Sequence, residues 1–109
     1  MKELIVKDLF EIIKSRQIDK VEGSYTCYLF EKGLDKILKK CGEECAELII
    51  AAKNADNGQI VYEACDLVYH MLVLLAERGI SLDAMYEELF TRAEKQRNLK
   101  IMHDSDKNT

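Results

Sequence analysis

One segment of the chain, from about Gln59 to Arg78, is apolar on nearly every side of a helix. Its apolar residues include Ile60, Val61, Leu67, Val68, Met71, Leu72, Val73 and Leu74. A helix with this pattern is normally surrounded by other helices, and Gly79 follows it as a C-terminal stop. The chain has no proline, which would interrupt long helices. The segment therefore predicts the central helix of an all-α bundle.

Apolar residues recur at three- and four-residue spacings in further segments, which predicts a bundle of about four to five helices. Ser24 or Thr26 is expected to cap a short helix, and Ser81 is expected to cap the last helix. The longer helices are expected at about residues 2–16, 34–55, 59–78 and 82–99.

The 109 residues, of which 48% are hydrophobic, suit one domain with a modest core. We expect this domain over residues 1–100 and a polar, disordered tail over residues 101–109, where periodicity is lost. The four cysteines form no C-x-x-C pair. This spacing favours reduced thiols that pack as small hydrophobes over a disulfide framework or a zinc site.

The net charge of -4 argues against electrostatic binding to the backbone of DNA or RNA. No uninterrupted apolar run reaches the roughly 18 residues of a membrane span, and the charged N-terminus is unlike a signal peptide. We therefore expect no nucleic-acid partner, no membrane partner and a cytoplasmic location.

Two acidic pairs interrupt the apolar pattern, Glu44 with Glu47 and Glu63 with Asp66. A three-residue spacing places both carboxylates of a pair on one helix face, although a single pair is more often solvated surface. Here Glu44 borders the apolar stripe of its helix, while Glu63 and Asp66 belong to the polar line of the central helix. Antiparallel packing of these consecutive helices would bring the four carboxylates together.

Four gathered carboxylates repel one another, and their burial is costly unless a cation neutralises them. Hard divalent cations prefer oxygen ligands, so the pattern predicts Mg²⁺, with Mn²⁺ as an alternative, held by Glu44, Glu47, Glu63 and Asp66. Magnesium commonly bridges carboxylates to phosphates, which predicts a small nucleotide substrate. Glu43 is a candidate for a second ion or for the base that activates water. His70 is expected to hydrogen-bond the Asp66 carboxylate as support rather than to ligate the metal.

Four further residues are candidates for substrate binding. Lys40 lies one turn before Glu44 and is the lysine favoured for a phosphate contact. Tyr25 is the tyrosine favoured for a contact to the base or a phosphate. Lys53 and Arg92 are further candidates, although such residues on helices are more often solvated or paired with glutamates.

Residues 43–47 and 63–66 resemble two motifs, E-E-x-x-E and E-x-x-D. These motifs are those of the MazG-like superfamily of all-α nucleoside-triphosphate pyrophosphohydrolases. Within that superfamily the chain resembles the phosphoribosyl-ATP pyrophosphohydrolase family in three stretches: Ser24-Tyr25-Thr26, residues 40–44 and residues 66–75. The similarity extends from the first helix to about Arg92, so it covers the expected domain. Cysteines at 41, 45 and 65 replace small aliphatic residues expected in relatives, which affects packing more than the motif.

This resemblance implies hydrolysis of phosphoribosyl-ATP to phosphoribosyl-AMP and pyrophosphate, the second step of histidine biosynthesis, with Mg²⁺ held by the four acids. It also implies a homodimer or larger homo-oligomer, and the apolar surface of such short helices independently predicts self-association. Some relatives are fused to the cyclohydrolase of the next step, and the length of 109 residues leads us to expect the stand-alone form.

Two other functions stay open at the level of sequence. A housecleaning (d)NTP pyrophosphohydrolase would share the acidic site and differ in its base pocket, although the segment from Ser24 to Thr26 argues against it. A non-enzymatic helical adaptor would form the same helices without releasing pyrophosphate.

Overall fold

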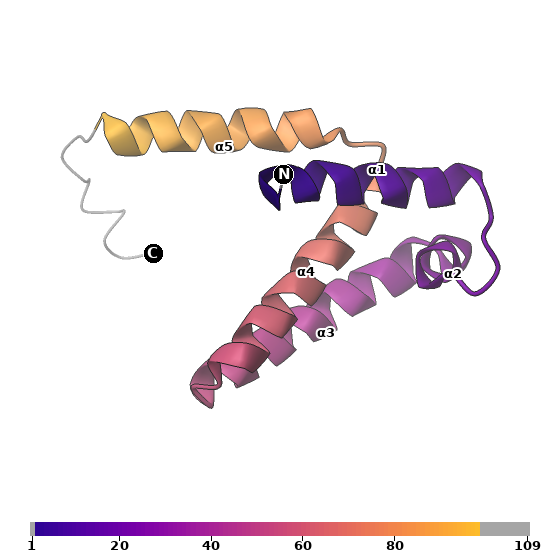
Figure 1. Ribbon diagram of the computed structural model, residues 1–109, viewed down its shortest axis with the longest axis horizontal. Helices are drawn as coiled ribbons and strands as arrows, with labels where there is room; N and C mark the ends of the chain where they lie inside the picture. The colour runs from indigo at the N-terminus through magenta and orange to yellow at the C-terminus, as the bar shows by residue number, and fades with distance from the viewer. Residues whose placement is uncertain (1, 99–109) are drawn as a thin grey trace.

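The computed structural model describes residues 2–98, and every regular element in that range is a helix (Figure 1). The elements are the 3-10 helix η1 (Lys2–Leu4), α1 (Ile5–Ile18), α2 (Tyr25–Lys32), α3 (Leu34–Lys53), α4 (Asn57–Glu77) and α5 (Leu82–Arg97). The expected all-α class is confirmed, and the helices lie close to their expected positions. The expected tail at residues 101–109 lies outside the described residues.

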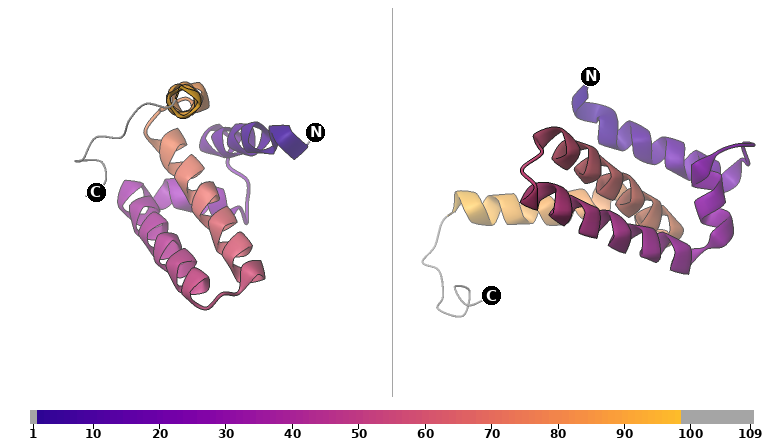
Figure 2. Two further views of the ribbon diagram at one scale, coloured as in Figure 1. Left: turned by 90° about the vertical axis from the view of Figure 1, so that its left-hand side faces the viewer. Right: turned by 90° about the horizontal axis from the view of Figure 1, so that it is seen from below.

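The helices α3 and α4 form a long antiparallel hairpin, which is the largest contact in the molecule (Figures 1 and 2). Helix α1 crosses α4, and α2 packs between α1 and the start of α3. The buried core lies where these four helices meet the start of α5 and consists of Phe10, Ile13, Leu29, Ile37, Leu72, Val73, Ala76 and Leu82. Because Ile37 is early in α3 and Leu72 is late in α4, the core occupies one end of the hairpin.

Local signals fix the ends of the helices as the sequence predicts. The Ser24 hydroxyl accepts a hydrogen bond from the backbone N–H of Cys27 at 3.1 Å, and so caps α2. The Ser81 hydroxyl accepts one from Ala84 at 3.1 Å and caps α5. Gly79, with a φ of 69°, follows the end of α4.

Gly33 joins α2 to α3 with a φ of 90° and a ψ of -171°, a conformation that other residues rarely adopt. A Cβ there would meet no atom within 4 Å, so substitution acts through the backbone alone. We expect Gly33→Ala to lower the free energy of unfolding by about 1–3 kcal/mol in urea titrations. Gly42→Ala, in the interior of α3, is the matched control and should raise it by up to about 1 kcal/mol. A stabilising Gly33→Ala would contradict this account of the connection.

Helix α5 packs on the rest of the chain through Leu82 and Met85 at its start and then extends away from the other helices (Figure 2). Its remaining large apolar side chains are exposed: Tyr86, Leu89 and Phe90. The far tip of the α3–α4 hairpin also exposes Ile49, Ile50, Val61 and Tyr62. Apolar surface of this kind is typical of an association surface. Cys45 and Cys65 are exposed free thiols, so for these two the expected packing role is wrong within the single chain.

By length and composition alone, α4 is long and apolar enough to cross a membrane. The core helix of a bundle passes the same test, and α4 has the features of one. Its polar residues include Glu63, Asp66 and His70, and of these Glu63 and His70 are buried. His70 meets the Tyr25 hydroxyl of α2, and Glu63 lies beside Glu44 of α3, which fits the central position predicted for this segment.

Candidate metal and phosphate site

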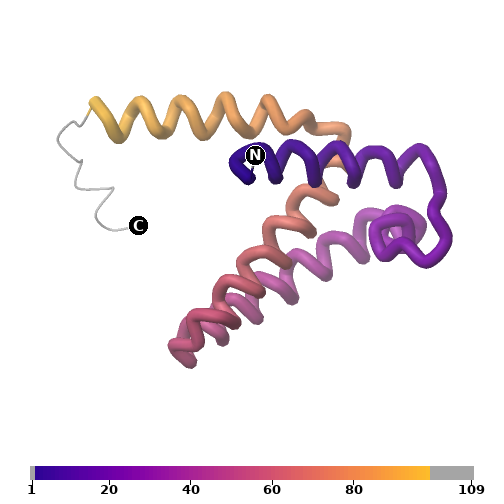
Figure 3. The backbone as a smooth tube through the Cα atoms, in the orientation of Figure 1, coloured from indigo at the N-terminus to yellow at the C-terminus, as the bar shows by residue number. Residues whose placement is uncertain are grey.

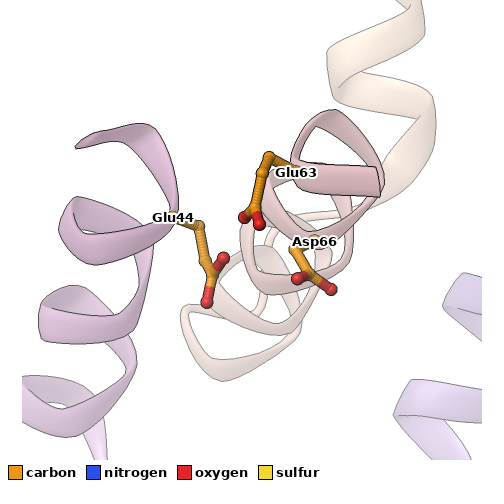
Figure 4. A group of neighbouring side chains, drawn as sticks. All are labelled: Glu44, Glu63 and Asp66. Carbon is orange, nitrogen blue, oxygen red and sulfur yellow. The ribbon is translucent and has the colours of Figure 1, made fainter. Parts of the chain in front are cut away.

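Three carboxylates point toward one another across the α3–α4 hairpin (Figure 4). They belong to Glu44 on α3 and to Glu63 and Asp66 on α4, and one oxygen of each lies within 4.8 Å of the others. Glu44 and Glu63 are each only 5% exposed. Each has a buried Oε2 atom without a hydrogen-bond partner in the described part of the chain. Because such oxygens are costly to bury, the arrangement favours a bound cation.

Glu47 completes the set of four acids, hereafter the acid cluster, at its solvent-exposed edge. A hydrogen bond with Glu63 raises the pKa of Glu47, and repulsion from the Glu44 and Glu63 carboxylates raises that pKa further. Crowded like charges have this effect on a carboxyl group. The structure thus gathers the four acids as the sequence predicts, while their role as metal ligands stays a prediction.

Gln59 orients one of the acids and was missed in the sequence analysis. Its Nε2 donates a hydrogen bond of 2.6 Å to Oε1 of Glu63, which leaves the Oε2 atom of Glu63 for the acid cluster. The available signal was its position one turn before Glu63 on α4. A pocket of 220 Å³ opens beside this pair and is lined by Glu47, Ile50, Ala51, Asn54, Gln59 and Glu63.

Lys40 lies at the edge of the acid cluster, as expected. Its Nζ is 3.5 Å from Oε1 of Glu44 and 4.0 Å from Oε2 of Glu43. Burial lowers the pKa of Lys40, but neighbouring Tyr25, Glu43 and Glu44 outweigh burial and raise it overall. The ammonium group therefore stays charged at neutral pH. Glu43 itself is half exposed and lies outside the three converging carboxylates.

Tyr25 and His70 form a hydrogen-bonded pair next to the acid cluster. Nδ1 of His70 lies 2.8 Å from the carbonyl oxygen of Asp66, and Nε2 lies 3.0 Å from the Tyr25 hydroxyl. A carbonyl oxygen only accepts, so Nδ1 carries a proton, and in that tautomer of the ring Nε2 accepts from the Tyr25 hydroxyl. Burial raises the pKa of Tyr25, which keeps this hydroxyl protonated. The expected bond from His70 to the Asp66 carboxylate is wrong, because an i to i−4 contact brings the ring to the backbone instead.

Lys53 and Arg92 are not brought into this group. Lys53 is the last residue of α3, and Arg92 lies on α5, where its Nε pairs with Oε2 of Glu88 at 3.0 Å. Within residues 2–98, neither residue forms an ion pair with the acid cluster. Their assignment to substrate binding stays a prediction that a single chain does not support.

Comparison with known proteins finds a family that matches most of the chain. Residues 6–93 match the family model of phosphoribosyl-ATP pyrophosphohydrolase. The phosphoribosyl-ATP pyrophosphatase of Clostridium botulinum strain Kyoto is 54% identical over 99 residues, which are 91% of this chain and 90% of that protein. The corresponding protein of Lactiplantibacillus plantarum is 53% identical over 95 residues, 87% of this chain and 90% of the relative.

A bifunctional relative matches over a shorter share of its own length. The histidine biosynthesis bifunctional protein HisIE of Thermoanaerobacter pseudethanolicus is 63% identical over 84 residues, 77% of this chain but 39% of that protein. This chain therefore spans about two fifths of that bifunctional relative. Residues 6–93, which match the family model, include nearly all of α1, all of α2 to α4 with the acid cluster, and most of α5. These matches to enzymes disfavour the adaptor alternative, and the chain belongs to the phosphoribosyl-ATP pyrophosphohydrolase family.

Proposed function

We propose that the protein hydrolyses phosphoribosyl-ATP to phosphoribosyl-AMP and pyrophosphate, in the cytoplasm, as the second step of L-histidine biosynthesis. The observation that carries this proposal is the pair of buried, unpartnered oxygens on Glu44 and Glu63, which face Asp66 in a chain of this family. Relatives named phosphoribosyl-ATP pyrophosphatase support the choice of substrate.

The acid cluster fits a divalent cation because it offers only carboxylate oxygens, the ligands that Mg²⁺ and Mn²⁺ prefer. Glu44, Glu47, Glu63 and Asp66 would hold the ion, with Gln59 fixing the orientation of Glu63. When bound, Mg²⁺ supplies Lewis-acid stabilisation of the negative charge on the phosphate oxygens. Lys40 adds a fixed positive charge at the edge of the same site.

The reaction breaks the anhydride bond between the α- and β-phosphates. The oxygen of a water molecule bonds to phosphorus, pyrophosphate leaves, and the water loses a proton to a carboxylate. Glu43 suits this last role because it lies beside Glu44 and stays half exposed, outside the three converging carboxylates. Glu44 is the second candidate for the base, since it is the neighbouring acid. Tyr25, held by His70, contacts the nucleotide beside the cluster.

The protein also self-associates, as a dimer or a larger homo-oligomer, in this proposal. Support comes from α5, whose exposed Leu89 and Phe90 have no partner helix in the described chain. Burial of such side chains against a second copy would remove their apolar surface from water.

Pyrophosphate release with a panel of nucleotides tests the proposed substrate. With Mg²⁺, we expect a kcat/KM for phosphoribosyl-ATP at least about a hundredfold above that for any dNTP, because specific polar contacts give discrimination of this size. Chelation of the metal by EDTA should stop release, and added Mg²⁺ should restore it. Comparable rates with dNTPs would favour the housecleaning alternative, and no release from any nucleotide would refute both.

A further inference from the structure

A row of charged side chains runs along α3 from the acid cluster toward α2. Lys36, Lys40 and Glu44 follow one another at four-residue spacing and therefore lie on one helix face. The Lys40 ammonium pairs with Glu44 at 3.5 Å. Along this row the charge changes from negative at Glu44 to positive at Lys40 and Lys36 within about two helical turns.

The positive end of the row meets an aromatic ring on α2. The ammonium nitrogens of Lys32 and Lys36 lie 5.8 and 5.9 Å from the centre of the Tyr28 ring. This geometry is typical of cation–π contacts, which hold an ammonium group in place while its N–H groups stay open to solvent. Within residues 2–98, neither ammonium has a carboxylate at ion-pair distance. Two charged donors are therefore free to bind an anion.

This lysine–tyrosine surface, formed by Tyr28, Lys32 and Lys36, is continuous with the acid cluster. The Tyr28 ring stacks on Tyr25 with centres 6.0 Å apart and planes 25° apart. The Tyr25 ring in turn meets His70 edge-on at 5.7 Å, and His70 bonds the backbone of Asp66. One nucleotide can therefore reach from the acid cluster across Tyr25 to the two lysines.

Phosphoribosyl-ATP carries one phosphate that ATP lacks, the ribosyl phosphate, on the ribosyl group attached to the adenine. That phosphate would be repelled by the acid cluster and requires a separate cationic contact. We propose that Lys32 and Lys36, positioned by Tyr28, bind this ribosyl phosphate and so distinguish phosphoribosyl-ATP from ATP. The inference rests on the proposed function, since it assigns the recognition of its substrate.

Loss of such a contact should weaken binding without slowing the chemistry, because the ribosyl phosphate does not react. For Lys36→Gln we expect KM for phosphoribosyl-ATP to rise about tenfold, as for one charge-assisted hydrogen bond, with kcat within about twofold. The inhibition constant of ATP as a competitor should stay unchanged, since ATP lacks the ribosyl phosphate. The double variant Lys32→Gln/Lys36→Gln should raise KM further, and Lys36→Arg should keep it near the wild-type value.

The matched control is Lys39→Gln, which removes one charge from an exposed position on the same helix and should leave both constants unchanged. An unaltered KM in Lys36→Gln and in the double variant would overturn the inference. So would an equal weakening of ATP and phosphoribosyl-ATP, because the lysines would then act on the shared triphosphate. Failure of the wild-type protein to hydrolyse phosphoribosyl-ATP would instead refute the proposed function.

Discussion

Glu63→Gln is expected to reduce kcat/KM for phosphoribosyl-ATP by at least about a hundredfold, while the metal-free protein becomes more stable. The loss follows because a bound cation would lose one of its charged ligands, and weaker cation binding weakens the hold on the phosphates. The gain follows because Glu63 lies beside Glu44, Glu47 and Asp66, and a neutral side chain relieves their repulsion. Glutamine keeps the shape, and its amide oxygen can still accept from Gln59.

The measurements are pyrophosphate release and the melting temperature with and without Mg²⁺. Wild-type protein should gain about 2.7 kcal/mol of stability at a Mg²⁺ concentration a hundred times its Kd, and Glu63→Gln should gain much less. Glu44→Gln, Glu47→Gln and Asp66→Asn should lose activity in the same way. Glu87→Gln, an exposed change on α5 that removes the same charge, is the control and should resemble wild type. Near-normal activity and Mg²⁺ response in two of the four site variants would show that the acids are solvated surface.

Leu89→Asp/Phe90→Asp is expected to convert the proposed oligomer into monomers and to lower the melting temperature. Leu89 is 51% exposed and Phe90 is 62% exposed in the single chain, on a helix that packs only through its first turn. Burying each side chain at an interface contributes about 1.5–3 kcal/mol, and a buried aspartate would oppose association further. The interface of a symmetric dimer would contain Leu89 and Phe90 from both copies, so the double substitution should raise the dissociation constant strongly.

Sedimentation equilibrium at micromolar concentration measures this effect directly. Ile18→Asp serves as the control, since Ile18 is an exposed apolar residue and the last residue of α1. In Figure 3, α1 ends on the right of the view, whereas α5 runs toward the left. It should leave the assembly unchanged. A wild-type protein that is monomeric under these conditions would contradict self-association, and an intact oligomer in the double variant would exclude α5 as its interface.

Much of the fold follows from local rules in the sequence. The period of apolar residues locates the long helices, and the hydroxyls of Ser24 and Ser81 mark where α2 and α5 begin. The acid cluster was also predictable, because a three-residue spacing fixes a helix face and a short connection makes α3 and α4 antiparallel. These are one-dimensional signals that need no knowledge of other helices.

The spacing of residues within one helix does not predict contacts between helices that are distant in the sequence. His70 bonds Tyr25 across 45 residues, and no spacing along α4 indicates that partner. The backbone conformation at Gly33 sets the direction of α2 relative to α3, so that Tyr28 contacts Lys36. The spacing of apolar residues within either helix does not predict this contact. Gln59 was missed for a different reason, since an amide one turn from a glutamate is common on solvated surfaces.

Because Lys36, Lys40 and Glu44 share one uninterrupted helix, α3 fixes the distance between the two ends of the site. At about 1.5 Å per residue, eight residues separate Lys36 from Glu44 by about 12 Å along the axis. One residue inserted between them would turn one end by about 100° relative to the other. Length changes in related chains should therefore fall in the connections at residues 19–24 and 54–56, whereas the interval from 36 to 44 should stay constant in length.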